Sequence, residues 1–175
     1  DTVVVGAPGH NSGAGAAYVF VRSGVAWAGQ DKLVAADAAA SDGFGAAAPI
    51  SPDTAAAGAA AAEVGALANA GAAYVFVRSG TTWNEQTKLT QPDAGAFDLF
   101  GGDADISADT VIVGGGQESA ANVFVRSGTV WTHQQRLATT NFARTVALDG
   151  DQAVVGNPLP VSRTGIAHVW SRTGS

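Results

Sequence analysis

Apolar residues in this chain occur in short runs separated by glycine, proline, aspartate and serine. The runs at Val3–Val5 and Val111–Val113 are apolar at three consecutive positions, and Tyr18–Val21 combines an aromatic pair with valine. Short runs of this kind, bounded by turn-forming residues, are typical of β-strands. A strand that is apolar at consecutive positions needs cover on both faces, so the two valine-rich runs are predicted to be inner strands.

A second kind of run begins with tryptophan and is polar at alternate positions. It occurs at Trp27–Leu33, Trp83–Leu89 and Trp131–Leu137, and its alternation predicts an outer strand with one face in water. The segments "SPDT" at Ser51 and "SADT" at Ser107 are short turn signals that are typical of hairpins. The chain is therefore predicted to be all-β, with antiparallel strands.

These runs recur in the same order along the chain. The nine residues Ala16–Gly24 reappear unchanged at Ala72–Gly80, and shorter variants follow at Asn122–Gly128 and Ala167–Gly174. Units of about 50 residues with four apolar runs predict the four-stranded antiparallel blades of a β-propeller. We expect about three and a half blades and fourteen strands, in the units 1–43 (first strand missing), 44–99, 100–141 and 142–175 (last strand missing).

Two short motifs stand at matching places in the units. "FG" occurs at residues 44–45 and 100–101, "GA" follows the first of these by fourteen residues at 58–59, and the triplet "GAP" is intact at 6–8. In these motifs the chain resembles, over essentially its whole length, the FG-GAP repeat of integrin alpha-chain heads and many bacterial surface proteins. The resemblance implies that each blade begins at the FG segment. It also implies a larger propeller, usually of seven blades, of which this chain supplies about half.

Some positions depart from the motifs. The third FG position is Phe142 and Ala143, and the later GAP positions read Gly-Ala-Ala, Gly-Gly-Gly and Gly-Asn-Pro, so the loops there are expected to differ in geometry. The run at Ala55–Ala57 has alanine where sister repeats have valine or isoleucine. Each missing methyl group is expected to weaken core packing by about 1 kcal/mol.

Composition narrows the classes of function. With 46% hydrophobic and 14% charged residues, the chain suits a globular protein with a core. A net charge of −6, with nine scattered Lys and Arg, argues against nucleic acid or an anionic membrane surface as a partner. No apolar run is long enough to cross a bilayer. The absence of cysteine excludes disulfides, cysteine-ligated zinc and thiol nucleophiles.

The candidate metal-binding residues lie in the loop before each FG segment. Asp37 and Asp42 in the first loop are matched by Asp93 and Asp98 in the second. Two carboxylates and backbone carbonyls make a partial calcium site, but calcium takes more oxygen ligands than each loop offers. Aspartates in turns more often accept hydrogen bonds from nearby backbone N–H groups. A turn role is therefore favoured and no cofactor is expected, with calcium kept as a weak candidate.

The resemblance directs attention to a second place for calcium. Integrin-type blades hold it in a D-x-D-x-D-G loop between their first and second strands. The corresponding loops here are 51–54, 107–110 and 148–152, which are too short to supply the ligands. No metal is expected in them.

Arginine and tryptophan repeat at fixed places in the units. The arginines either grip an acidic glycan or a partner carboxylate, or pair with repeated residues such as Asp53 and Asp109. The tryptophans are either sugar-stacking residues or packing anchors whose indole N–H finds a local acceptor. Repetition in successive units favours the structural interpretation for both sets: Arg22, Arg78, Arg126 and Arg172, and Trp27, Trp83 and Trp131.

Catalysis is not indicated by the sequence. His10, His133 and His168 lie at different places in the units, without a second ligand or a triad partner at informative spacing. We therefore expect a non-catalytic protein that is extracellular or at a cell surface, of bacterial type. The leading hypothesis is a structural or adhesive scaffold that assembles with copies of itself or with further repeats. The alternative is a glycan- or protein-binding module, assisted by calcium.

The ends of the array carry a further expectation. We interpret the sequence as a processed or partial chain, because it starts and stops inside repeat units. End units with one neighbour leave apolar faces and strand edges that need cover. The 175 residues are therefore not expected to be a self-sufficient monomer. A head-to-tail fibre is favoured over a ring, since the incomplete end units do not sum to whole ones.

Overall fold

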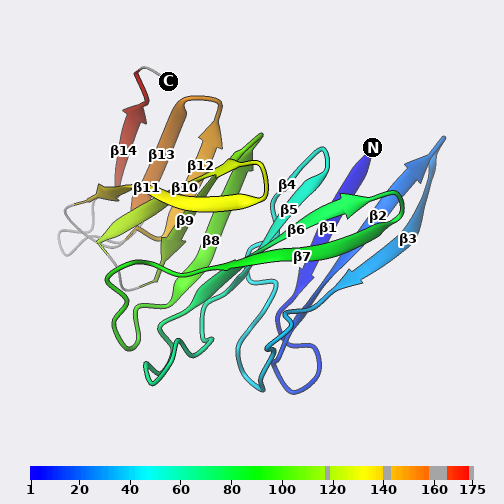
Figure 1. Ribbon diagram of the computed structural model, residues 1–175, viewed down its shortest axis with the longest axis horizontal. Helices are drawn as coiled ribbons and strands as arrows, with labels where there is room; N and C mark the ends of the chain where they lie inside the picture. The colour runs from blue at the N-terminus through cyan, green and yellow to red at the C-terminus, as the bar shows by residue number, and fades with distance from the viewer. Residues whose placement is uncertain (117–118, 140–142, 158–164, 174–175) are drawn as a thin grey trace.

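The computed structural model describes residues 1–116, 119–139, 143–157 and 165–173. These residues form fourteen β-strands in four antiparallel sheets, and no helix. The sheets stand side by side along the longest axis of the molecule, with β3 and β14 toward opposite ends (Figure 1). The all-β fold with antiparallel four-stranded units is confirmed.

The strands are numbered in chain order, and we name the sheets 1 to 4 in the same order. Sheet 1 contains β1 (Thr2–Ala7), β2 (Ala16–Ser23) and β3 (Ala26–Leu33). Sheet 2 contains β4 (Ile50–Ser51), β5 (Thr54–Ala59), β6 (Ala72–Ser79) and β7 (Thr82–Leu89). Sheet 3 contains β8 (Phe100–Ser107), β9 (Thr110–Gly115), β10 (Ala120–Ser127) and β11 (Val130–Ala138). Sheet 4 contains β12 (Thr145–Asp149), β13 (Gln152–Asn157) and β14 (Ile166–Ser171).

Each strand pairs with its neighbours in sequence, so the repeated segments occupy equivalent places. The valine- or alanine-rich strands β1, β5, β9 and β13 each pair with the following strand. The repeated arginine lies in that strand in sheets 1 to 3 and directly after it, at Arg172, in sheet 4. The register also repeats, with a bulge between Val19 and Phe20 that recurs between Val75 and Phe76 and between Val123 and Phe124. Identical local sequence therefore produces identical local backbone structure in successive sheets.

The hydrophobic core lies between the sheets. Side chains alternate between the two faces of a strand, and we call the face toward the preceding sheet the front and the opposite face the back. Ala57 and Phe76 on the front of sheet 2 share a core cluster with Val4 and Val19 on the back of sheet 1. Two further clusters join sheet 2 to sheet 3 and sheet 3 to sheet 4 in the same way. Three cores in series therefore hold the four sheets together.

The FG and GA motifs meet at these contacts. Phe44 and Phe100 are fully buried, and parallel bridges join them to Gly15 and Gly71 of the preceding unit. A Cβ atom on Gly58 would lie 1.9 Å from the carbonyl oxygen of Gly101. Glycine is therefore required in the motif, because the two backbones approach too closely there for any side chain.

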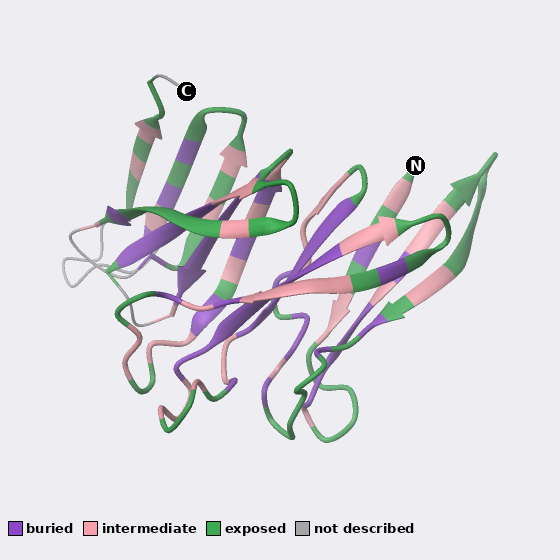
Figure 2. Cartoon of the chain, in the orientation of Figure 1, coloured by how far each residue is buried: buried purple, intermediate pink, exposed green. Residues whose placement is uncertain are grey.

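The predicted cover of the inner strands holds for the middle sheets and not for sheet 1. All six residues of β9, which contains "VIV", are buried, as are all six of the alanine-rich β5. In β1 only Val4 is buried, while Val3 is 38% and Val5 48% exposed. Figure 2 shows the same concentration of buried residues in the middle sheets. The prediction of two covered faces is wrong for β1, because sheet 1 has a neighbour at its back alone within the described structure.

Candidate functional site

The first acidic loop, which connects β3 to β4, borders a cavity together with the loop between β5 and β6. This cavity has a volume of about 440 Å³, and its polar lining includes Asp37, Asp42, Glu63 and Lys88. The Asp42 side chain is buried, and its Oδ2 accepts a 2.7 Å hydrogen bond from the backbone N–H of Ala39. Asp42 therefore closes a turn, which is the role that the sequence favoured.

Asp37 links the loop to the following sheet. Its Oδ1 accepts a 2.7 Å hydrogen bond from the Tyr74 hydroxyl, and its Oδ2 lies 2.7 Å from Lys88 Nζ. Burial raises the pKa of the Asp37 carboxyl, but the bonds from Lys88 and Tyr74 outweigh it and the net pKa lies below its ordinary value. Burial and the Asp37 charge raise the pKa of Tyr74. Through its charged carboxylate, Asp37 therefore ties the loop that follows sheet 1 to β6 and β7 of sheet 2.

The second acidic loop has the same character. Asp98 Oδ2 accepts hydrogen bonds from the Gln91 side-chain amide and from the backbone N–H of Gly95. Asp93 lies 3.5 Å from Arg136, measured from Oδ2 to Nε. Within the described residues, no group of three or more His, Cys, Asp or Glu side chains is placed to hold a metal ion. The four candidate aspartates are thus each engaged by protein donors.

The repeated arginines end their strands beside repeated aspartates. Arg126 pairs with Asp109 at 2.5 Å and Arg172 with Asp151 at 2.6 Å, from Nη2 to Oδ1, and Arg22 pairs with Asp1. These contacts agree with the structural interpretation. Arg78 donates from Nε to the carbonyl oxygen of Gly80 at 2.9 Å instead.

The same arginines also reach the preceding sheet. Arg126 Nη1 donates to Thr54 Oγ1 at 3.1 Å, and Arg172 Nη1 lies 3.5 Å from Thr110 Oγ1. Each of these guanidinium groups therefore bridges two sheets.

The repeated tryptophans also act between sheets. Trp83 Nε1 donates to Gln30 Oε1 at 3.2 Å, and Trp131 Nε1 donates to Gln86 Oε1 at 2.7 Å. Trp83 is buried, whereas Trp27 of sheet 1 is 49% exposed. The packing role predicted for the tryptophans is seen in sheets 2 and 3, and Trp27 stands at the open front of the array.

Two aspartates that the sequence analysis did not select join sheet 3 to sheet 4. Asp103 Oδ2 accepts a 2.8 Å bond from the backbone N–H of Val146, and Asp105 Oδ2 a 2.7 Å bond from that of Leu148. Burial raises the pKa of Asp103 above its ordinary value, against the lowering effect of its N–H donors Val146 and Ala104. The sequence feature that could have identified this pair is the alternation "DAD", which places both carboxylates on one face of a strand.

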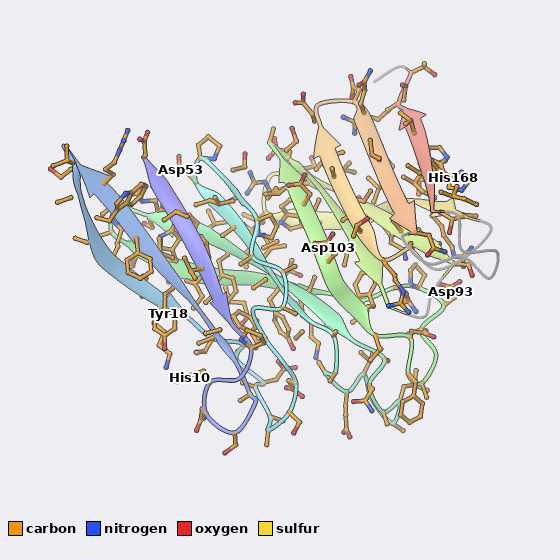
Figure 3. All side chains as sticks on the ribbon, turned by 180° about the vertical axis from the view of Figure 1, so that it is seen from behind. His10, Tyr18, Asp53, Asp93, Asp103 and His168 are labelled. Atoms are coloured by element: carbon orange, nitrogen blue, oxygen red, sulfur yellow. The ribbon has the colours of Figure 1, made fainter. Side chains whose placement is uncertain are left out.

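The histidines lie apart, as Figure 3 shows for His10 and His168. His10 Nε2 lies 2.8 Å from Lys32 Nζ, and His133 Nε2 lies 2.9 Å from Asn122 Oδ1. The His168 ring stacks on Trp170 with 5.4 Å between centroids. Their surroundings differ from one another and suggest no shared chemistry.

Each end face of the array carries exposed apolar residues, among polar ones on the back of sheet 4 such as Asp149 and Gln152. On the front of sheet 1, Val3 lies opposite Phe20 and Val5 opposite Tyr18, and both valines are exposed. On the back of sheet 4, Val154 lies opposite Val169, and these are 37% and 67% exposed. The two surfaces belong to the same repeat and correspond to the faces that pack together between the inner sheets.

No helix in the described residues is long and apolar enough to cross a membrane.

Comparison with known protein families identifies the FG-GAP repeat in this chain. The model of the FG-GAP repeat matches residues 27–76 and 83–133, which together make up more than half of the chain. Both matched segments begin in an outer strand, β3 or β7, and continue through the FG motif of the next sheet. The repeat as matched therefore spans a contact between two sheets. No curated protein matches the chain.

Proposed function

The chain belongs to the FG-GAP repeat family, and from this premise we propose that it is a non-catalytic extracellular scaffold, structural or adhesive, that works by assembling end to end with copies of itself. The observation that carries the proposal is the pair of end faces, each with exposed apolar residues. One is the front of sheet 1 with Val3 and Val5, and the other is the back of sheet 4 with Val154 and Val169.

The inner contacts show how such faces fit. Ala55 and Ala57, on the front of sheet 2, correspond to Val3 and Val5 and share a core with the back of sheet 1. Ile112, on the back of sheet 3, corresponds to Val154 and shares a core with the front of sheet 4. A copy whose sheet 1 stacks on sheet 4 of another repeats this contact. Because the two patches differ, the contact is head to tail and continues as a filament unless its rotation closes a ring.

The energy of such a contact is large for a small chain. Burial of apolar surface is worth about 25 cal/mol per Å², so several hundred Å² contributes on the order of 10 kcal/mol before the cost of association. That gross figure is comparable with the whole stability of an ordinary domain. Contact with another copy is therefore expected to lower the free energy of such an end face relative to its exposure to water.

Molar mass in solution tests this function. Light scattering coupled to size exclusion, run over a wide range of protein concentration, is expected to give masses above that of the 17.4 kDa chain that grow with concentration. Electron microscopy of the same samples separates filaments from closed rings. A monomer of constant mass over the whole range contradicts the proposal.

A second function is supported by the cavity beside the first acidic loop. With Asp37, Asp42 and Glu63 at its walls, this space of about 440 Å³ is suited to a ligand with several donor groups, such as a glycan, or to a basic segment of a protein. Calcium is a candidate aid to such binding. Calorimetric titration with calcium, and then with glycans in its presence, tests this function, and Asp42→Ala is expected to weaken any binding seen.

A further inference from the structure

The cavity beside the first acidic loop is formed mainly by two connections inside the chain, one from β3 to β4 and the other from β5 to β6. Its volume of about 440 Å³ lies within the range of small-molecule sites. The polar residues that line it are Asp37, Ser41, Asp42, Glu63, Asn69 and Lys88. The cavity therefore offers charge and hydrogen-bonding groups to a ligand of moderate size.

The charge around this cavity is predominantly negative. Lys88 is already paired with Asp37 at 2.7 Å, whereas Asp42 and Glu63 form no ion pair among the described residues. Burial, and after it the charges of Asp37 and Asp42, raise the pKa of Tyr74, so the Asp42 carboxylate acts as a charge in this region. A positively charged ligand is attracted to such a cavity, and an acidic one is repelled.

The Asp42 carboxylate has one oxygen available to a ligand. The residue is 7% exposed, and its Oδ2 accepts the bond from the Ala39 N–H, while its Oδ1 accepts no hydrogen bond from the described residues. A buried charged oxygen without a donor costs free energy. A ligand with an ammonium group that donates to Oδ1 removes this cost.

An exposed aromatic residue lies beside the cavity. The backbone N–H groups of Phe97 and Leu99 donate to the carbonyl oxygens of Ala68 and Asn69 at 2.9 and 3.1 Å, and Asn69 lines the cavity. Phe97 is 60% exposed and has a φ of +68°, which bulky residues rarely adopt. Its ring is a flat apolar surface, of the kind on which the apolar face of a sugar ring stacks.

We propose that the cavity and Phe97 together bind an oligosaccharide with free amino groups, such as a chain of glucosamine units. One ammonium group donates to Asp42 Oδ1 and is attracted by the Glu63 carboxylate. The sugar chain extends past Asn69, and a neighbouring ring stacks on Phe97. The site rests on the second function proposed above and names its ligand, and it is independent of the end-to-end contact.

Calorimetric titration with matched sugars tests the ligand class. The probes are a glucosamine tetramer and an N-acetylglucosamine tetramer, which has the same rings and linkages but no positive charge. A mildly acidic buffer keeps the amines protonated, and a chelator keeps the carboxylates free of metal. The first tetramer is expected to bind saturably, and the second at least tenfold more weakly, because it leaves the buried carboxylate unpaired.

A tetralysine peptide is the third probe, because it carries positive charge without sugar rings. It is expected to bind more weakly than the glucosamine tetramer, and equal or tighter binding overturns the proposal. Equal binding of the acetylated tetramer also overturns it. If either of these probes binds and the glucosamine tetramer does not, the proposal fails and the broader binding function stands. If all three fail to bind, both fail.

Variants of the protein locate the binding. Asp42→Asn keeps an acceptor for the Ala39 N–H and removes the charge, so it is expected to weaken the glucosamine tetramer at least tenfold. The control is Asp53→Asn, the same change in the exposed β4–β5 hairpin at the other end of sheet 2 (Figure 1), which is expected to leave binding unchanged. Equal affinities of these two variants overturn the proposal.

Phe97 is tested separately, since its exposed ring can be removed with the fold kept, as circular dichroism checks. Phe97→Ala is expected to weaken the glucosamine tetramer about fivefold through loss of stacking. Phe97→Trp retains an aromatic surface and is expected to retain the affinity. Unchanged binding by Phe97→Ala, or the same loss in both variants, contradicts the stacking role.

Discussion

At the scale of single residues, the glycines of the motifs are required by contact between backbones. Gly58 and Gly6 each face the carbonyl oxygen of an FG glycine, Gly101 or Gly45, at 1.9 Å from the position of a Cβ. That carbonyl oxygen belongs to the backbone of the next unit, so it can move away only if the two sheets separate. The spacing of the sheets therefore decides whether a side chain fits at these positions.

Gly58→Ala is expected to lower the free energy of unfolding by about 1–3 kcal/mol, because the added methyl group overpacks a backbone contact. The control is Gly9→Ala, where a Cβ meets nothing within 4 Å and the change is expected to stay within about 0.5 kcal/mol. Urea unfolding of both variants at one protein concentration measures the difference. Equal stability of the two variants contradicts the close contact.

Asp103 gives stability a pH dependence of known sign. Its folded-state pKa is raised, so the folded state holds the proton more tightly than the unfolded chain does. Its stabilising contribution is complete below the unfolded pKa and is lost as pH rises through the raised folded pKa. Asp103→Asn is neutral at every pH and lacks this loss. From pH 4 to 7, the free energy of unfolding of the wild type is expected to fall relative to that of the variant, and a constant or rising difference contradicts the assignment.

At the scale of elements, the outer strands connect the sheets as well as completing them. β7 and β11 were expected to have one wet face, and their polar residues do reach water. The tryptophan at the start of each, however, turns to the preceding sheet and donates to its glutamine. The pairs are 53 and 45 residues apart in sequence, so the contact is a property of neighbouring units.

The pair Trp131 and Gln86 is expected to couple sheets 2 and 3 energetically. Trp131→Phe removes the indole N–H while keeping an aromatic ring, and Gln86→Ala removes the acceptor. A double-mutant cycle on these changes is expected to give a coupling free energy of about 0.5–1.5 kcal/mol, the net value of a neutral hydrogen bond. Additive effects of the two substitutions contradict a working bond between the sheets.

At the scale of the whole molecule, an open row of sheets has two unlike ends. The front of sheet 1 and the back of sheet 4 each have apolar residues that the described structure leaves uncovered. A propeller that closes on itself has no such ends. In a row of four sheets, the end faces are covered only by contact with another copy or with further repeats.

Val5→Glu is expected to prevent end-to-end assembly, because the contact would bury an unpaired carboxylate. Val5 is 48% exposed on the front of sheet 1. Val25→Glu adds the same charge to the same sheet at a fully exposed turn, and is expected to leave assembly unchanged. Light scattering at matched concentrations compares the two variants, and the same mass distribution for both excludes the front of sheet 1 as the interface.

Much of this architecture was predictable from local pattern. Strand order, hairpins and most strand positions follow from runs and turn residues within about 50 residues, and they are found as expected. The first strand of sheet 2 is shorter than expected, since β4 spans Ile50–Ser51 and does not include the FG motif at 44–45. The turn role favoured for Asp42 was also predictable, because its donor Ala39 is three residues away. Contacts between units were not: the partners of Asp103 and of the tryptophans lie more than forty residues away.

The segments Ala16–Gly24 and Ala72–Gly80 show which features the local sequence determines and which depend on tertiary packing. Their identical sequences determine the same strand, the same bulge and the same turn to an outer strand, since these depend on neighbouring residues of one chain. Yet Tyr74 is 1% exposed and Tyr18 is half-buried. Tyr74 and Phe76 lie under the back of sheet 1, while Tyr18 and Phe20 face the open front of the array. Burial is a property of the surface that packs against a strand, so only the tertiary structure decides which copy becomes core and which remains a surface for a partner.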